Sequence, residues 1–457
     1  MTDASRIAVI DIGKTNAKVV VLDALSGTEL VSRRAPNRSI DSAPYLHFDT
    51  DALWTFVSGA LRELAADPGY DVISITTHGA SLVLLDANGN LAMPMIDYEA
   101  IYPETVRAAY AGLRPPFSET FSPPLPGGLN AGAQLHYQKT VFPDEFARVA
   151  TILTYPQYWA FRLTGIATNE KTSLGCHTDL WDIAEDRYSS LVDRLGLRDL
   201  MAPIASAFDC LGNTTPAVTA ELGLSRPVPV HCGIHDSNAS LLPHVVTRKA
   251  PFSVASTGTW VISFAVGGSI AGLDAARDTL VNLDAYGRPV PSGRFMGGRE
   301  YEMLTANLAP SSEEEIEVAL PRVLTAGTML LPSICEGSGP FPHNKTRWIN
   351  EPSDPAERHT AISLYLALMT ATCFDLLSAA GPTVVEGPFS RNRLYLKALA
   401  AITSRPVIVV DGSVPTGTAE GAALLTGMTP PPTRDLVFEP TLDLAAYRTE
   451  WLRQASA

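Results

Sequence analysis

Residues 11–18 read Asp11-Ile12-Gly13-Lys14-Thr15-Asn16-Ala17-Lys18, a polar turn between two runs of β-branched residues. The flanking runs, residues 7–11 and 18–23, predict a β-hairpin. The turn contains Gly-Lys-Thr, but Ala8 stands five residues before the glycine and a strand follows, so it is not a P-loop. Such a turn can still hold phosphate through its backbone N–H groups, while the leading carboxylate holds a hydrated metal ion.

A second hairpin of the same build is predicted at residues 251–266. Its turn, Ser256-Thr257-Gly258-Thr259, carries hydroxyl groups but no carboxylate, so it can meet phosphate oxygens without adding negative charge. Either hairpin alone is also compatible with an ordinary surface turn. Because each opens one half of the chain, the pair predicts duplicated domains that hold a nucleotide.

The length and the order of the predicted elements both indicate two α/β domains. A chain of 457 residues is too long for one hydrophobic core, because single cores stop growing at about 250 to 300 residues. Apolar spacing predicts a helix at residues 52–65 and a strand at 70–76. The second half ends in the same layered pattern of helix, strand, helix, strand and helix from residue 360 onward. We expect domains at residues 1–244 and 245–457.

The composition excludes several classes of protein. A formal charge of −14 offers no basic footprint for nucleic acid or an acidic membrane surface. The apolar run at residues 361–380 is interrupted by polar side chains, so it indicates a buried helix, not a membrane span. The 5 cysteines are widely spaced without a CxxC pair, which argues against disulfides and zinc. With no export leader at the start, the chain is expected in the reducing cytoplasm.

Asp236 is the best candidate for a catalytic carboxylate. Phosphoryl transfer to a hydroxyl needs a carboxylate to accept the proton and align the attacking oxygen. Asp236 follows a short strand that stops at Gly233, and it precedes a helix that it could instead cap. His235 and His78 also follow strand ends, where they could contact a sugar hydroxyl or form structural hydrogen bonds.

With these motifs located, the chain resembles the FGGY family of carbohydrate kinases, in order and over nearly its whole length. The resemblance is carried by residues 11–18, Gly233-Ile234-His235-Asp236, residues 256–260, and Glu386-Gly387-Pro388-Phe389-Ser390-Arg391 with residues 417–423. It implies an α/β fold of two RNase-H-like domains related to actin and Hsp70, with the nucleotide and the sugar in a cleft between them. The first domain would bind the sugar and the second most of the ATP.

The resemblance also implies roles for single residues. Asp236 would be the catalytic base, and Asp11 would help to position Mg²⁺. The residues implied for binding ATP are Asp11, Gly13, Lys14, Thr15, Asn16, Lys18, Thr257, Gly258, Thr259, Gly387, Ser390 and Gly421. Those implied for binding the sugar are His78, Gly79, Tyr98, Glu99, His235 and Asp236.

Within the family, residues 77–86 and 256–260 look most like rhamnulose kinases, which predicts a deoxy-ketose such as L-rhamnulose or L-fuculose. Two segments depart from the family pattern. Residues 95–99 lack the arginine of the sugar segment in many relatives, and Gly387-Pro388 replaces paired glycines near the adenosine helix. A pentulose or glycerol kinase, and an actin-like or chaperone-type ATPase, remain alternatives, and a homodimer is kept open as the assembly.

Overall fold

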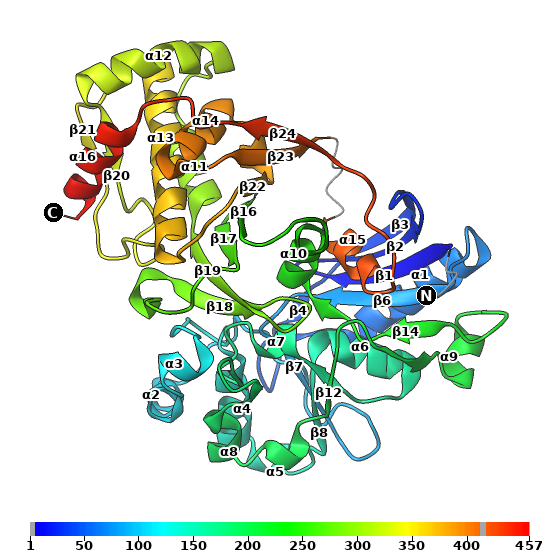
Figure 1. Cartoon of the computed structure of the whole chain (residues 1–457). Helices are drawn as coiled ribbons and strands as arrows, with labels where there is room; N and C mark the ends of the chain where they lie inside the picture. Colours follow the sequence, from blue (N-terminus) through cyan, green and yellow to red (C-terminus); the bar gives the residue numbers. More distant parts are fainter. Residues whose placement is uncertain (1–4, 412–416, 457) are drawn as a thin grey trace. The chain divides into compact units, whose positions relative to one another are not determined.

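The computed structural model describes residues 5–411 and 417–456, which form two compact α/β units (Figure 1). The first unit contains Met1–Thr247, Val281–Pro289 and Thr416–Pro431. The second contains Arg248–Leu280, Val290–Pro415 and Pro432–Ala457. The chain therefore passes from the first unit to the second next to Thr247, and two later segments belong to the first unit again.

The first unit is built on a mixed sheet with the order β13-β14-β6-β1-β2-β3, in which β15 also pairs with β6. The three N-terminal strands are antiparallel neighbours, whereas β6 runs parallel to β1, and β14 runs parallel to β6. The strands are β1 (Arg6–Ile12), β2 (Asn16–Asp23), β3 (Glu29–Pro36), β6 (Val72–Thr77), β13 (Cys210–Asn213), β14 (Pro229–His231) and β15 (Ile234–His235).

Helices bury both faces of this sheet, because alternate residues of each strand point to opposite sides. Ala8 and Ile10 pack with α1 (Thr50–Ala66) and α6 (Tyr155–Thr164). Ile7 and Val9 pack on the other side with α10 (Asp236–Thr247) and α15 (Gly417–Leu424). The second of these helices comes from a segment far along the chain, so the core of the first unit needs residues from near the C-terminus.

The remaining elements of the first unit are short. They are β4 (Ser39–Ile40), β5 (His47–Phe48), β7 (Leu82–Leu85), β8 (Thr151–Thr154), β9 (Asn169–Glu170), β10 (Trp181–Asp182), β11 (Arg187–Tyr188), β12 (Ile204–Ala205), α2 (Glu104–Leu113), α3 (Phe117–Thr120), α4 (Ala131–Val141), α5 (Pro143–Phe146), α7 (Lys171–Leu174), α8 (Ser190–Arg194), η1 (Arg198–Leu200) and α9 (Pro216–Glu221).

The second unit repeats the strand pairing of the first in a sheet of order β18-β19-β17-β16-β22-β23-β24. As in the first unit, a hairpin pairs on one side with an antiparallel strand and on the other with parallel strands. The elements are β16 (Phe252–Thr257), β17 (Val261–Val266), η2 (Ala275–Arg277), β18 (Thr279–Leu283), β19 (Pro289–Phe295), α11 (Gly297–Thr305), α12 (Glu313–Ala326), β20 (Met329–Leu331), β21 (Arg347–Ile349), α13 (Pro355–Leu376), β22 (Thr383–Glu386), η3 (Pro388–Arg391), α14 (Arg393–Thr403), β23 (Val407–Asp411), β24 (Arg434–Phe438) and α16 (Ala445–Ala455).

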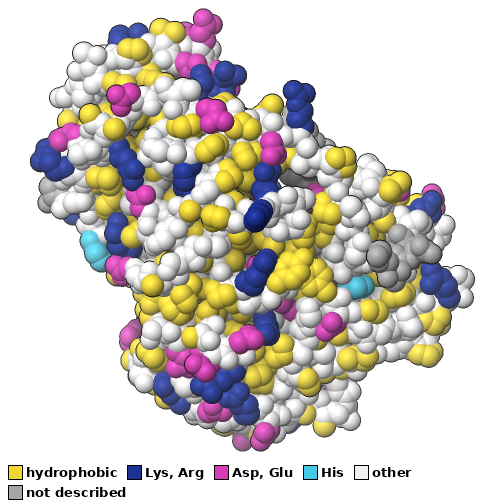
Figure 2. All heavy atoms as spheres, in the orientation of Figure 1, with side chains coloured by type: hydrophobic (Ala, Val, Ile, Leu, Met, Phe, Trp, Pro, Cys, Tyr) yellow, Lys and Arg dark blue, Asp and Glu magenta, His cyan; other side chains and the backbone are white. Residues whose placement is uncertain are grey.

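These elements confirm the predicted hairpins, the helix of residues 52–65 as α1, the strand of residues 70–76 as β6 and the buried helix as α13. The predicted α/β class with duplicated domains is also confirmed. Strand β24 and helix α16 were not predicted. In the described part of the chain no helix combines the length and the apolarity that a bilayer crossing requires. On the face drawn in Figure 2, basic and acidic side chains are interspersed.

Candidate active site

Three strands of the first unit end side by side, and they bring the candidate catalytic residues together. Thr76 of β6 pairs with Asp11 of β1 on one side and with Ile234 of β15 on the other. The three strands are parallel, so their carboxyl ends meet at one edge of the sheet, where ligands of α/β proteins usually bind. Asp236 begins α10 directly after β15.

A one-residue bulge precedes Asp236. Val230 pairs with Ile73 and Ile234 pairs with Thr76, so one strand advances by four residues while the other advances by three. Gly233 lies in the bulge with φ of +89°, and a Cβ there would lie 2.9 Å from the Ile75 carbonyl oxygen. An extra residue reverses the face to which later side chains point, so the bulge sets the direction of the segment that carries Asp236.

Side chains from two helices hold this irregular backbone. Gln157 of α6 is fully buried, and its Nε2 donates to the carbonyl oxygens of Cys232 at 2.9 Å and Gly233 at 3.1 Å. Thr172 Oγ1 accepts the His235 N–H at 3.1 Å, and the hydroxyl itself donates to buried Glu170. The bulge removes ladder hydrogen bonds, and these side chains replace them.

Asp236 lies beside His235. Its Oδ1 is 3.2 Å from His235 Nε2, and its side chain is 31% exposed, so a ligand can reach it. Burial raises the pKa of Asp236, whereas interaction with His78 acts in the opposite direction. A carboxylate with a raised pKa accepts a proton more readily than an ordinary aspartate does.

Both histidines are neutral near pH 7. Burial lowers the pKa of His78 to about 4, and it also lowers the pKa of His235 to about 4. The His235 ring lies against Gly79, where a Cβ would come within 2.5 Å of Nε2. Glycine at that position is therefore required by the approach of the imidazole, and a neutral imidazole can donate from one nitrogen and accept at the other.

Asp11 is a second carboxylate at the same edge, and its environment suits a divalent cation. Burial and the charge of Asp236 raise the pKa of Asp11 to about 7, although Lys18 and Arg34 act in the opposite direction. Magnesium is usually bound by one or two carboxylates together with substrate phosphates. Asp11 can supply one such carboxylate, although no group of three or more His, Cys, Asp or Glu side chains among the described residues could hold a metal alone.

The first hairpin turn presents its backbone in a fixed conformation. The Gly13 N–H donates to the Asn16 carbonyl oxygen at 2.8 Å, while Thr15 and Asn16 are exposed. Asn37, which was not predicted, donates from Nδ2 to the Gly13 carbonyl oxygen at 2.8 Å and from its backbone to the Thr15 carbonyl oxygen. The turn is therefore rigid and open, as a phosphate contact would require.

The two lysines of this hairpin point to different neighbours. Lys18 pairs across the hairpin with Asp11, and its Nζ lies 2.5 Å from Glu29 Oε2. Lys14 Nζ instead forms an ion pair with Asp97 and lies 3.6 Å from Glu99 Oε2. Lys14 was predicted with the ATP-binding group, but its side chain lies among the residues predicted for the sugar.

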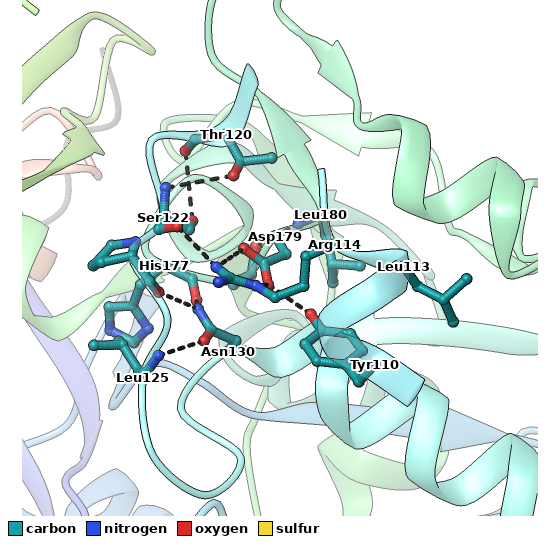
Figure 3. A network of polar contacts seen from close by, with 12 residues as sticks. Tyr110, Leu113, Arg114, Thr120, Ser122, Leu125, Asn130, His177, Asp179 and Leu180 are labelled. Carbon is teal, nitrogen blue, oxygen red and sulfur yellow. Dashed lines mark hydrogen bonds and ion pairs between the residues drawn. The ribbon is translucent and has the colours of Figure 1, made fainter. Parts of the chain in front are cut away.

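A loop at residues 121–130 contacts the backbone of Tyr98. The Gly128 N–H donates to the Tyr98 carbonyl oxygen at 2.7 Å, and a Cβ at Gly127 would lie 2.6 Å from the same oxygen. Asn130 accepts the Leu125 N–H at 2.8 Å and donates to two carbonyl groups (Figure 3). These hydrogen bonds fix the loop that contacts the Tyr98 carbonyl group.

The network in Figure 3 anchors that loop to the rest of the unit. The guanidinium of Arg114 makes two hydrogen bonds to buried Asp179, at 2.7 and 2.9 Å, and a third to the Ser122 carbonyl oxygen. Tyr110 donates to the same carboxylate at 2.6 Å. A bidentate arginine pair is both strong and directional, so this network is a structural support for the predicted sugar residues.

The second unit carries its own backbone cradle. Thr257 Oγ1 donates to the Glu386 carbonyl oxygen and accepts the Phe389 N–H at 3.1 Å. A Cβ at Gly387 would lie 1.8 Å from the Thr257 carbonyl oxygen, and one at Gly298 would lie 1.9 Å from the Gly258 carbonyl oxygen. The segments around Thr257 and Gly387, which were predicted as separate ATP motifs, are therefore in contact. Gly298 at the start of α11, which was not predicted, contacts Gly258 of the same turn.

Other predicted ATP residues have different surroundings. Ser390 Oγ donates to the Gly387 carbonyl oxygen at 2.7 Å, and the Thr259 carbonyl oxygen accepts the Arg299 N–H at 3.2 Å. Gly421 lies in α15 within the first unit, where a Cβ would lie 1.7 Å from the Ala239 carbonyl oxygen. The absence of a side chain at Gly421 allows α15 to pack closely on α10.

Comparison with known families identifies the chain. Residues 6–243 match the domain described as "FGGY family of carbohydrate kinases, N-terminal domain". Residues 249–434 match "Carbohydrate kinase FGGY, C-terminal domain". The chain belongs to the FGGY family of carbohydrate kinases, which are phosphotransferases with an alcohol group as acceptor.

Curated relatives are similar at low identity. A rhamnulokinase of Oceanobacillus iheyensis is 26% identical over 271 residues, which is 55% of this chain and 54% of that protein. An L-fuculokinase of Haemophilus influenzae is 26% identical over 288 residues, which is 56% of this chain and 57% of that protein. The matched regions span about half of the length of these relatives.

Solved structures match over the whole chain. A carbohydrate kinase from Novosphingobium aromaticivorans has a TM-score of 0.93 and 37% identity, covering 100% of this chain and 99% of that one. A xylulose kinase from Rhodospirillum rubrum has a TM-score of 0.83 at 19% identity, covering 99% of this chain and 97% of that one. The second match, at low identity, shows the shared fold alone.

Proposed function

We propose that this protein is an ATP-dependent sugar kinase that phosphorylates a hydroxyl group of a ketose. The observation that carries the proposal is the arrangement of Asp236, which begins a helix at the carboxyl ends of parallel strands and lies beside His235 Nε2 at 3.2 Å. Asp236 is open enough to meet a ligand and is buried enough to have a raised pKa. Those are the properties of a general base for an alcohol.

The proposed reaction has one chemical step. Asp236 accepts the proton of the sugar hydroxyl while the hydroxyl oxygen forms a bond to the γ-phosphorus of ATP. The bond between that phosphorus and the bridging oxygen breaks, and ADP leaves with the electron pair. Mg²⁺ held near Asp11 would offset the negative charge of the phosphates.

The two units take different parts in this proposal. The first binds the sugar with His78, Gly79, Tyr98, Glu99, His235 and Asp236. The second binds most of the nucleotide through the backbone at Thr257, Gly258 and Gly387, where the two glycines are exposed and can meet phosphate oxygens. Gly13, Thr15, Asn16 and Lys18 would contact phosphate from the first unit.

We propose a deoxy-ketose such as L-rhamnulose or L-fuculose as the substrate. This choice is supported by the names of the relatives, a rhamnulokinase and an L-fuculokinase, and by the aromatic rings around His78. Tyr98, which is partly exposed, can pack on an apolar sugar face such as a methyl group. The 5 free cysteines support the proposed placement in the reducing cytoplasm.

A panel of sugars tests the proposal. Purified protein with ATP and MgCl₂ is mixed with L-rhamnulose, L-fuculose, D- and L-xylulose, glycerol and D-gluconate, and ADP release is followed. One ketose should accelerate ADP release well above the rate without sugar, with one sugar phosphate formed per ADP. Preference for xylulose or glycerol would favour the pentulose or glycerol alternative. ATP hydrolysis that no sugar accelerates would instead favour an actin-like or chaperone-type ATPase.

A further inference from the structure

Lys14 belongs to the hairpin turn that was predicted to bind phosphate, but its ammonium group lies among acidic and aromatic side chains. Its Nζ forms an ion pair with Asp97 and is 3.6 Å from Glu99 Oε2. It also lies 4.7 Å from the ring centroid of Phe48 and 4.8 Å from that of Tyr98. These contacts come from strand β5 and residues 97–99, outside the hairpin that carries Lys14.

His78 lies against the same two rings. Its ring centroid is 5.1 Å from that of Phe48 and 5.8 Å from that of Tyr98. Its Nδ1 is 3.0 Å from the Gly79 carbonyl oxygen, so the neutral ring carries its proton on Nδ1. Nε2 is then an acceptor, and it is buried without a hydrogen-bond partner among the described residues.

The acidic partners orient Lys14 without using all its hydrogens. Asp97 is buried, its Oδ1 accepts the Glu99 N–H at 2.9 Å, and its Oδ2 accepts from Ser39 as well as from Lys14. An ammonium group has three N–H donors, and the Lys14 side chain is 22% exposed. An oriented donor is therefore left for a ligand at the two rings that His78 also contacts.

Lys18 provides the contrast within the same hairpin. It lies opposite Asp11, and its charge partly opposes the effect of burial, which raises the pKa of that carboxyl group. The charge of Lys14 instead lowers the pKa of His78. One lysine therefore faces the carboxylate proposed for the metal and phosphates, and the other faces the histidine proposed for the sugar.

We infer that Lys14 is a sugar-binding, specificity-determining residue and not a phosphate ligand, and that with His78 it recognises hydroxyl groups of a neutral ketose. This inference rests on the proposed kinase function. A hydroxyl group both donates and accepts, so it matches a lysine donor next to a histidine acceptor. Asp97, Glu99 and Asp236 outnumber the single cation of Lys14, so carboxylated sugars are disfavoured by like charge.

The test compares Lys14→Met with Lys18→Met as a matched control. Initial rates are measured with L-rhamnulose, or with L-fuculose if that ketose is turned over faster, while sugar and MgATP are varied separately. Lys14→Met should raise KM for the ketose by about 10- to 100-fold, the usual effect of losing a charge-assisted hydrogen bond, and change KM for ATP by less than about twofold. Lys18→Met should show the opposite pattern.

A rise in KM for ATP without a rise for the ketose would overturn the inference, as would unchanged values for both. Thermal unfolding verifies that the variants fold. If Lys14→Met does not fold, Lys14→Gln is measured in its place. Calorimetric titration of the ketose into each protein without ATP gives the same comparison when turnover is low, and tighter or equal binding to Lys14→Met would contradict the inference.

Efficient phosphorylation of D-gluconate by the wild type would refute the neutral substrate class. Absence of any sugar-dependent turnover in the wild type would instead refute the proposed function.

Discussion

Asp236, the proposed general base, has a pKa that burial raises, and interaction with His78 offsets only part of that rise. We predict that Asp236→Asn lowers kcat by about 10² to 10⁴, the usual contribution of a positioned general base. The amide keeps the shape of the side chain but cannot accept the hydroxyl proton. Steady-state kinetics measure the loss, and ADP binding by calorimetry should stay near the wild-type value. Near-normal turnover would remove Asp236 from the mechanism.

The buried carboxyl group of Asp11 makes the stability of the protein depend on pH. Its pKa is raised from 3.8 to about 7 in the folded protein, so the folded state holds a proton there that the unfolded state has released. The stability of the ligand-free wild type should therefore fall as pH rises through that window.

Asp11→Asn removes the Asp11 contribution to this dependence, whereas Glu170, whose pKa burial also raises to about 7, keeps its own. At pH 8 the ligand-free variant should have a Tm equal to or above that of the wild type, and its relative advantage should shrink at pH 5. MgATP should raise the Tm of the wild type more than that of the variant, because the proposed carboxylate for the metal is gone. A variant that is less stable than the wild type at pH 8, by differential scanning fluorimetry, would contradict the burial of a charged Asp11.

At the scale of elements, the bulge between β14 and β15 determines which way the segment with the proposed base Asp236 points. Its carbonyl groups are buried and are bound by Gln157. We predict that Gln157→Leu destabilises the protein by about 1 to 3 kcal/mol, because buried carbonyl oxygens lose their donors. It should also lower kcat at least about tenfold, since His235 and Asp236 shift with the backbone.

Gln138→Leu is the matched control for that prediction. Gln138 is equally buried and donates to Tyr45 Oη at 2.7 Å, away from the bulge. It should lose stability to a similar degree while kcat stays within about twofold of the wild type. Urea unfolding and initial rates are measured on both variants, and an equal drop in kcat would show that Gln157 acts through general stability alone.

At the scale of the whole molecule, the first unit is completed by α15. Ala419, Ala422 and Ala423 of that helix pack with Ile7 and Val9 of β1. Ser74 of β6 also donates to the Ala422 carbonyl oxygen at 2.6 Å. Without this helix, one face of the sheet would expose apolar side chains to water.

We therefore predict that a fragment of residues 1–247 does not unfold cooperatively and binds a dye for exposed apolar surface. Joining residues 417–431 to its C-terminus through a flexible linker should restore a cooperative thermal transition. Circular dichroism and dye fluorescence on both fragments measure this difference. A sharp transition in the shorter fragment would show that the first unit folds without α15.

Local patterns were sufficient to predict much of the architecture. The β-hairpins, the helix α1 and the buried helix α13 follow from alternation, apolar spacing and turn residues within short windows. Asp236 was predicted by a local signal as well, because a strand end followed by a helix start is visible in sequence. Their partners were not predicted, since Asn37, Gln157 and Thr172 belong to no recognisable pattern and act through contacts with distant residues.

The sequence alone determined the class of fold, the duplication and the positions of the phosphate-type turns, because these depend on interactions between residues close along the chain. Only the tertiary structure decided that Lys14 pairs with Asp97, that Gly421 allows close helix packing in the first unit, and that a bulge turns the segment before Asp236. The physical reason is that strand register and side-chain pairing are set by burial and hydrogen bonding across the whole unit, which no short stretch of sequence contains.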